Sequence, residues 1–323
     1  MTSAVVLMSP ELRDRLFTAQ DWQRLEGLVR IDHVGPAVPA GGIDAAIAIT
    51  GWDSEPLTDD PAVLPSLRFV AHSGGSVRSI LPRSLFGRGV RVIQVAAVIG
   101  EAVAEYAVMA IIAGLRDAPA FATDLTNGVP WNTSRPPGRL LHGSTVGIVG
   151  ASRTGIATIH RLRPFGCRIL VADPLLTTAD ALALGVERST LDDLCARSHV
   201  VSLHAPVLPS TIGMIGVQQV AAMQPGSVLV NTARAALIDE HAVLAAAAAG
   251  AIRVITDVFP TEPLPLDSAW RGAPGVTATP HIAALTSETM LAQGRQSVDE
   301  IERFLSSSPL EGEILEADYD RIA

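Results

Sequence analysis

Three polar side chains each follow a short run of residues that is typical of a buried β-strand. Arg234 lies in NTARAALIDE (231–240), Glu262 in DVFPTEP (257–263) and His281 in TPHIAA (279–284). The carboxyl ends of parallel strands meet at one edge of a sheet, and open α/β sheets bind their ligands there. We therefore expect the guanidinium, the carboxylate and the imidazole to lie close together.

These three residue types suit one reaction well. The planar fork of an arginine can hold a carboxylate and a neighbouring carbonyl oxygen. A histidine exchanges a hydroxyl proton near neutral pH, and a nearby carboxylate orients the imidazole and stabilises its protonated form. The set therefore indicates the interconversion of a 2-oxo acid and a 2-hydroxy acid.

A glycine-containing loop follows a predicted strand in TVGIVGASRTG, residues 145–155. Gly150 and Gly155 match the first and third glycines of a dinucleotide fingerprint, but Ser152 stands where the second glycine is expected. Asp173 follows the next strand, 18 residues after the last glycine, near the usual offset for the acid that binds an adenosine ribose. A carboxylate there repels a 2′-phosphate, so the loop predicts a dinucleotide site that favours NAD over NADP.

The composition of the 323-residue chain argues against several classes of function. A net charge of -9 disfavours nucleic acid as a partner, because phosphate backbones require a basic surface. All 24 basic residues are arginine, so no lysine can form a Schiff base or a Walker-type phosphate site. The two cysteines, Cys167 and Cys195, have no CxxC spacing, and we expect neither a disulfide framework nor a metal site.

The sequence predicts neither export nor insertion into a membrane. The N-terminal segment MTSAVVLMSPELRDR has no basic residues before its short apolar run, unlike a signal peptide. The most apolar helical stretch, Ala102–Leu115, is interpreted as too short to span a bilayer and is accompanied by Glu101 and Glu105. We therefore expect a cytoplasmic protein without a membrane partner.

Strand-like and helix-like runs alternate along the chain, which predicts an α/β fold. The predicted strands are Val5–Leu7, Ala46–Ile49, Arg68–Ala71, Val90–Val95, Thr145–Val149, Arg168–Ala172, Val200–Ala205, Ser227–Asn231, Arg253–Asp257 and Val276–Ala278. The predicted helices include Glu101–Arg116, one that starts at Arg153, Glu240–Ala249 and Ser287–Leu305, and the turn-rich segment Asn127–Arg139 is expected to be a loop.

The regular alternation in the second half predicts βαβ units and a doubly wound parallel sheet. We expect two Rossmann-like domains of this kind. The substrate domain is expected to comprise residues 1–100 and 285–323, because the last helix should return to it. The NAD-binding domain is expected to comprise residues 101–284 and to be inserted into the substrate domain.

In order and spacing, the motifs above and VVSLHAPVLPST (200–211) resemble those of the D-isomer-specific 2-hydroxyacid dehydrogenases, from about Val103 to Ala284. In the N-terminal part, HSGGS (72–76) looks like the glycine-rich substrate loop of that family, although Val77-Arg78 follows it where Val-Asp is usual. The resemblance implies an NAD-dependent enzyme of the phosphoglycerate dehydrogenase or glyoxylate–hydroxypyruvate reductase type. It also implies a homodimer, for which the apolar helix Glu101–Leu115 is a candidate contact.

The resemblance assigns roles by position. Arg234 would bind the substrate, His281 would be the acid–base group and Glu262 its partner. The substrate carboxylate would be held by the substrate loop, Ser73, Gly74, Gly75 and Ser76. The cofactor would contact Gly150, Ser152, Arg153, Thr154, Gly155, Asp173, His204, Ala205, Pro206, Thr211, Thr232, Ala233, Asp257 and Ala283, with Asp257 on the nicotinamide carboxamide and Arg153 and Thr154 on the pyrophosphate.

Two departures from the family pattern bear on these roles. The Cβ of Ser152 reduces the clearance for the pyrophosphate, whereas its hydroxyl can donate to a phosphate oxygen. Ala235 replaces the glycine usual after the catalytic arginine, and we expect it to shift that loop slightly. His204 is expected to have its hydrogen bonds satisfied near the cofactor, and whether His72 touches the substrate stays open.

Two other functions stay open at this point. One is a different oxidoreductase on the same scaffold, although the Arg–Glu–His set disfavours formate oxidation and the lack of lysine disfavours phosphite oxidation. The other is an NAD(H)-sensing binding protein, like the transcriptional corepressors that share this fold. The identity of the acid is also open, because Arg78 and Arg83 are both candidates for binding a phosphate or a second carboxylate.

Overall fold

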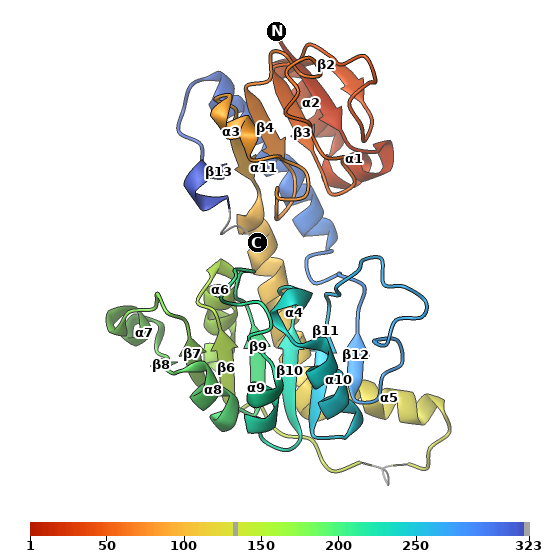
Figure 1. Ribbon diagram of the computed structural model, residues 1–323, viewed down its shortest axis with the longest axis vertical. Helices are drawn as coiled ribbons and strands as arrows, with labels where there is room; N and C mark the ends of the chain where they lie inside the picture. The colour runs from red at the N-terminus through yellow and green to blue at the C-terminus, as the bar shows by residue number, and fades with distance from the viewer. Residues whose placement is uncertain (132–134, 320–323) are drawn as a thin grey trace. The chain divides into compact units, whose positions relative to one another are not determined.

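The computed structural model describes residues 1–131 and 135–319, which fold into two compact units. Unit 1 comprises Met1–Ile99 and Leu285–Ala323, and unit 2 comprises Gly100–Ala284, so unit 2 is inserted into unit 1 along the chain. Each unit is a mostly parallel sheet with helices on both faces (Figure 1). This confirms the predicted α/β class with two Rossmann-like sheets.

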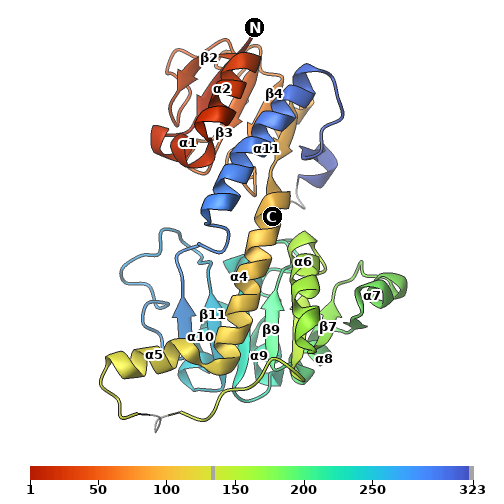
Figure 2. The same cartoon turned by 180° about the vertical axis from the view of Figure 1, so that it is seen from behind.

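Unit 1 is built on a six-stranded sheet in the order β13-β5-β4-β3-β1-β2, in which only the short β13 is antiparallel to its neighbour. Its strands are β1 (Thr2–Leu7), β2 (Val29–Val34), β3 (Ile47–Thr50), β4 (Phe69–His72), β5 (Arg91–Gln94) and β13 (Glu313–Ile314). Its helices are α1 (Pro10–Leu16), α2 (Ala19–Leu28), α3 (Ser84–Gly87) and α11 (Ser287–Leu305). Helices α1, α2 and α11 cover one face of this sheet (Figure 2), and α3 contributes to the core on the other face.

Helix α11 comes from the far end of the chain and completes the core of unit 1. Its side chains Met290, Val298 and Ile301 are buried with residues of β1, β3 and β4. Its Gly294 lies so close to α1 that a Cβ at this position would overlap the carbonyl oxygen of Leu16. The close approach of the two helices therefore requires a glycine.

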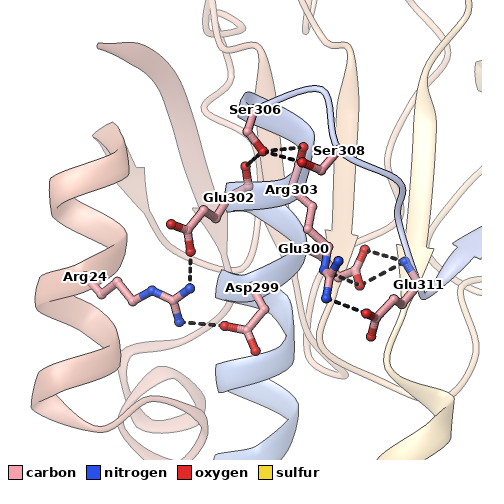
Figure 3. Close-up of polar contacts among 8 residues, drawn as sticks. All are labelled: Arg24, Asp299, Glu300, Glu302, Arg303, Ser306, Ser308 and Glu311. Atoms are coloured by element: carbon pink, nitrogen blue, oxygen red, sulfur yellow. Dashed lines mark hydrogen bonds and ion pairs between the residues drawn. The ribbon is translucent and has the colours of Figure 1, made fainter.

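Polar contacts connect α11 to α2 and to the segment that follows α11 (Figure 3). Arg24 of α2 pairs with Asp299 at 2.5 Å and also with Glu302. Both carboxylate oxygens of the buried Glu300 accept from the backbone amide of Glu311 at 3.1 Å, and burial raises the pKa of Glu300. Exposed ion pairs such as those of Arg24 stabilise a protein by less than about 1 kcal/mol, so they contribute more to the orientation of α11 than to the stability of the fold.

Unit 2 is built on a seven-stranded parallel sheet in the order β12-β11-β10-β9-β6-β7-β8. Its strands are β6 (Thr145–Val149), β7 (Arg168–Ala172), β8 (Glu187–Arg188), β9 (Val200–Leu203), β10 (Ser227–Asn231), β11 (Ile252–Thr256) and β12 (Val276–Ala278). Its helices are α4 (Ala96–Arg116, which starts in unit 1), α5 (Ala118–Thr126), α6 (Arg153–Leu162), α7 (Thr178–Leu184), α8 (Leu191–Arg197), α9 (Val217–Ala222) and α10 (Glu240–Ala248). Helices α4, α6 and α7 pack on one face and α8, α9 and α10 on the other.

Helix α4 is longer than the sequence predicted, because it begins at Ala96 instead of Glu101. Its 21 residues include an 18-residue window with a mean hydropathy of 1.8, which is long and apolar enough to cross a membrane, so the interpretation that this stretch is too short was wrong. Length and composition alone are weak grounds for a membrane span, since a core helix passes the same test. In unit 2, Ala110, Ile111 and Leu115 of α4 pack into the core.

Three strands were not predicted. Strand β2 is an edge strand with polar residues Arg30, Asp32 and His33, and its half-exposed residues do not alternate regularly. Strands β8 and β13 have only two residues each, which is too short for a recognisable pattern.

We predict that Gly294→Ala destabilises unit 1. The added Cβ must push α11 away from α1, and overpacking of this kind costs about 2 kcal/mol in free energy of unfolding. Urea denaturation of the whole chain measures the change. Gly27→Ala in α2 is the matched control, because a Cβ there meets nothing within 4 Å and the substitution should be neutral or stabilising. Equal stability of the Gly294→Ala chain and the parent would contradict the prediction.

Candidate active site

Glu262 and His281 are joined by a hydrogen bond. His281 Nδ1 lies 2.6 Å from Glu262 Oε2 and donates to it, while Glu262 Oε1 accepts from the backbone amide of Phe259 at 2.8 Å. The carboxylate is thereby fixed, and Nε2 is the ring nitrogen left for a reactant. The two side chains are 48% and 33% exposed for His281 and Glu262, so the pair is accessible.

The loop that carries His281 is held by the carboxylate of Asp257. This carboxylate is fully buried, and its oxygens accept from Thr279 Oγ1 at 2.6 Å and from the amides of Ile282 and Ala283 at 2.9 and 2.7 Å. These donors lie on both sides of His281, whose φ of 53° is rare for a residue with a Cβ. Asp257 therefore maintains a strained backbone that directs the imidazole toward Glu262.

A second hydrogen bond supports the same loop from α4. Because Thr279 Oγ1 donates to Asp257, the hydroxyl of Tyr106 must be the donor in its 2.6 Å contact with Thr279 Oγ1. Burial raises the pKa of Tyr106, with a smaller effect of the same sign from Asp257, so the phenol keeps its proton. Tyr106, Thr279 and Asp257 thus form a directed chain of hydrogen bonds that ends at the loop of His281.

Arg234 follows β10 in a loop that is shaped by Asn231. The Asn231 side chain accepts from the amide of Ala233 at 3.1 Å and donates to the carbonyl of Arg234 at 3.0 Å. Burial lowers the pKa of the Arg234 guanidinium, and the charge of Glu262 partly opposes this. The structure therefore brings Arg234 and the Glu262–His281 pair to the carboxyl ends of β10, β11 and β12.

Ala235, which replaces the expected glycine, opens a short 3-10 helix, Ala235–Leu237. It is not among the described residues with positive φ, so the methyl group causes no backbone strain. Backbone strain at Ala235 therefore gives no reason to expect that this loop is shifted.

The loop after β6 forms a cradle that only glycines permit at two positions. Gly150 has a φ of 98°, and a Cβ there would lie 2.7 Å from the amide nitrogen of Ala205. A Cβ on Gly155 would overlap the carbonyl oxygen of Gly150. Such a cradle, with the amide groups of Arg153 and Thr154 in the first turn of α6, fits the pyrophosphate of a dinucleotide.

Ser152 has a structural role that explains its presence in this loop. Its backbone is extended (φ −65°, ψ 174°), so this position does not require a glycine. Its Oγ accepts from the amide of Gly155 at 3.2 Å and caps the N-terminus of α6. The Ser152 oxygen is thus used as the acceptor that caps α6, and its hydroxyl proton is still available for donation to another group.

Asp173 lies at the end of β7 and is tied to the same loop. Its Oδ2 accepts from the amide of Ala151 at 2.7 Å and its Oδ1 from the amide of Leu175 at 2.8 Å. The carboxylate is thus held beside the cradle with acceptor sites left over for other donors.

The other predicted cofactor residues are placed around the ends of β9 and β10. Thr211 Oγ1 donates to the carbonyl of Pro206 at 2.7 Å and closes the loop after β9. His204 is buried, which lowers its pKa to about 4; its Nε2 contacts Ser202 Oγ at 2.9 Å, but Nδ1 has no partner. The expectation that His204 has both ring nitrogens satisfied therefore holds for only one of them. The hydroxyl of Thr232 is also buried without a partner.

The predicted substrate loop belongs to unit 1 and follows β4. It is anchored by the amide of Ser73, which donates to the carbonyl of Thr50 at 2.8 Å, and by the Ser73 hydroxyl, which contacts Ser297 Oγ at 2.7 Å. The amides of Gly74, Gly75 and Ser76 have no partner within residues 1–131 and 135–319. They remain donors available to an anion.

His72 lies beneath this loop and is almost fully buried. It contacts Thr50 Oγ1 at 2.9 Å through Nδ1 and makes a hydrogen bond with the backbone of Ser76. Burial lowers its pKa to about 4, against a smaller opposing effect of the Ser76 hydrogen bond. A Cβ on Gly74 would overlap the imidazole. His72 thus supports the loop as a neutral group.

Several of these contacts had no role assigned from the sequence. Asn231 and Thr279 stand within motifs, and an Asn after a strand is a known signal for a side-chain turn. Tyr106 lies on a helix 173 residues before Thr279, and nothing in its local sequence indicates the contact. In the part of the chain that the structure describes, no group of three or more His, Cys, Asp or Glu side chains could hold a metal ion.

A glycine cradle on a parallel sheet, with the carboxylate of Asp173 fixed beside it, defines a Rossmann-type dinucleotide-binding domain. Residues 108–283 match the family model described as "D-isomer specific 2-hydroxyacid dehydrogenase, NAD binding domain". The match covers more than half of the chain, and the chain belongs to this family. The family resemblance and NAD as the cofactor are thereby confirmed.

Relatives with curated names agree with this assignment. The chain is 35% identical over 269 residues to a D-3-phosphoglycerate dehydrogenase of Mycobacterium bovis, which covers 83% of this chain and 49% of the relative. The chain thus spans about half the length of the phosphoglycerate dehydrogenases that it matches. It is 33% identical over 229 residues to a glyoxylate reductase of Korarchaeum cryptofilum, covering 70% and 69% of the two chains.

The fold also matches solved structures. A glyoxylate reductase from Paecilomyes thermophila superposes with a TM-score of 0.84 at 24% identity, covering 98% of this chain and 99% of the other. At this identity the likeness shows the shared fold alone.

The buried His72 predicts a pH dependence of stability. Its pKa in the folded chain, about 4, is below the ordinary value of 6.5. The unfolded chain therefore binds more protons between these values, and stability falls as the pH falls. Between pH 7 and pH 5, His72 should therefore lower the free energy of unfolding by about 2 kcal/mol. Urea denaturation at both pH values should show a smaller loss for His72→Gln than for the parent, with His160→Gln as the control. An equal loss in His72→Gln would contradict this.

Proposed function

We propose that this chain catalyses the NAD-dependent interconversion of a 2-oxo acid and a D-2-hydroxy acid. The observation that carries the proposal is the Glu262–His281 hydrogen bond of 2.6 Å, next to the charge of Arg234 and in the same unit as the dinucleotide cradle. This is an acid–base pair and an anion-binding group in one place, on a domain built to hold NAD.

In the proposed mechanism Arg234 binds the substrate carboxylate and the carbonyl oxygen. Its positive charge stabilises the negative charge that develops on that oxygen during reduction. The hydride comes from the nicotinamide of the bound cofactor. His281 donates a proton from Nε2 to the oxygen, and in the reverse direction it removes that proton. Glu262 stabilises the protonated imidazole and keeps Nε2 directed at the reactant.

The remaining site residues are proposed to bind cofactor and substrate as follows. The amides of Gly74, Gly75 and Ser76, with Ser73 as an anchor, hold the substrate carboxylate. The family resemblance assigns Asp257 to the nicotinamide carboxamide, and this contact requires the buried carboxylate to become accessible when the cofactor binds. The pyrophosphate and the rest of the cofactor contact the loops after β6, β7, β9 and β10, namely Gly150, Ser152, Arg153, Thr154, Gly155, Asp173, His204, Ala205, Pro206, Thr211, Thr232, Ala233 and also Ala283. The carboxylate of Asp173 supports NAD over NADP.

We also propose a cytoplasmic homodimer without a membrane partner. Helix α5 has no buried residue, and its Leu125 is 61% exposed, as is much of Met109 on α4. Apolar side chains that find no cover within their own chain are typical of a subunit interface. Sedimentation velocity should give the mass of a dimer at micromolar concentration, and a monomeric mass would refute the proposal.

The function is tested by NADH oxidation at 340 nm with a panel of 2-oxo acids: glyoxylate, hydroxypyruvate, phosphohydroxypyruvate and acids with longer side chains, next to an NADPH control. We expect turnover with NADH. Glu262→Gln removes the negative charge beside His281 and should lower kcat/KM about 100-fold, with the pH–rate profile for reduction moved toward acid. NADH affinity should not change.

The panel also separates the proposal from its alternatives. Tight NADH binding without turnover of any acid would favour a cofactor-sensing binding protein. An unchanged rate and pH profile for Glu262→Gln would remove Glu262 from the mechanism while leaving the enzyme class intact.

A further inference from the structure

A cavity of about 380 Å³ lies in unit 2 at the edge of the sheet opposite the proposed active site. Its walls include Ser227, the first residue of β10, and Arg253, near the start of β11, whereas Asn231 is the last residue of β10 and Asp257 follows the other end of β11. A five-residue strand separates the two edges by about 13 Å. The cavity is therefore distinct from the dinucleotide cradle.

Two of the side chains that line the cavity are positively charged. These are Arg139 and Arg253, next to the neutral His199, and no Asp or Glu lines the cavity, although the chain as a whole has a net charge of -9. The guanidinium of Arg139, an exposed residue, has no hydrogen-bond or ion-pair partner within residues 1–131 and 135–319. A concave wall of one sign concentrates ions of the opposite sign.

Arg253 is held in place beside this free cation. Its Nη2 donates to the carbonyl of Gly226 at 2.5 Å. The nearest acid is Asp117, at 3.9 Å from Arg253 Nη1, but Asp117 lies closer to Arg135, at 3.3 Å. The charge of Arg253 is thus only weakly compensated, and the side chain is already positioned for a ligand.

One further group in the cavity has hydrogen-bonding capacity that the described residues do not use. His199 Nδ1 accepts from the amide of Thr145 at 2.9 Å, so the proton of the neutral ring is on Nε2, which makes no hydrogen bond with the described residues. This N–H is available to a ligand in the cavity.

We propose that this cavity binds a phosphate-type dianion, either inorganic phosphate or the phosphoryl group of a small phosphate monoester. Two guanidinium groups and an imidazole N–H supply the several donors that a tetrahedral anion accepts. The volume lies within the range of small-molecule sites. This inference does not depend on the proposed catalytic function.

Electrostatics gives a local readout for the site. Burial lowers the pKa of His199, and the charge of Arg139 lowers it further. A bound dianion next to the ring opposes both effects. The pKa of His199, followed by NMR of its ring protons, should therefore be higher in phosphate than in chloride at the same ionic strength.

The test is a titration of the whole chain with inorganic phosphate and, separately, with glycerol 3-phosphate, at constant ionic strength. NAD is kept at saturation so that the glycine cradle is blocked. We expect a saturable shift of the His199 signals, weakened at least ten-fold in Arg139→Gln and in Arg253→Gln. Arg188→Gln, an exposed arginine of the same unit, is the matched control and should bind as the parent does.

Each outcome decides the question. Tighter binding of the ester than of phosphate identifies a metabolite as the ligand, and equal binding identifies free phosphate. A shift that does not saturate, that chloride reproduces or that both arginine variants retain would overturn the proposal. Melting temperatures of the variants verify that they are folded. If the parent chain binds phosphate in this cavity but turns over none of the 2-oxo acids, the proposed function is refuted and the phosphate site is not.

Discussion

The buried carboxylate of Asp257 is the constraint on which the proposed active site depends. A charge removed from water is stable only when donors surround it. Its donors here are Thr279 and the amides of Ile282 and Ala283, so the charge is satisfied only if the loop after β12 takes one path. That path forces His281 into a left-handed conformation and aims Nδ1 at Glu262. The geometry of the Glu262–His281 pair thus depends on the buried charge of Asp257, which is not a member of the pair.

The strands of both sheets were predictable where they are buried on both sides. Continuous apolar runs bounded by turn residues gave β6, β7 and β10 with the observed bounds, and the amphipathic pattern of α11 gave its full length. The half-exposed edge strand β12 was also predicted with the observed bounds. Strand β2 was not predicted because one side of it is solvated, so its sequence has no continuous apolar run. The first residues of α4 were not predicted to be helical because the residues after β5 are apolar throughout. In such a stretch, periodicity alone does not separate a strand from a helix.

The site was predictable to the extent that its residues stand at strand ends. Glu262 and His281 were expected to meet, and they do, because β11 and β12 are neighbours in a parallel sheet. The supporting contacts were not predictable, since Tyr106 reaches Thr279 across a long stretch of sequence. Ser152 looked like a defect in the glycine loop, but only three-dimensional structure shows that its hydroxyl caps α6.

The return of α11 to unit 1 has a consequence for biosynthesis. Strands β1–β5 leave the ribosome before unit 2, but α11, which covers one face of their sheet together with α1 and α2, is encoded after the whole of unit 2. Unit 2 has all of its strands in one continuous segment, so it can fold while the last helix is still being made. During translation, unit 1 therefore begins before unit 2 and is completed after it, and until then the part of its sheet that α11 covers stays exposed.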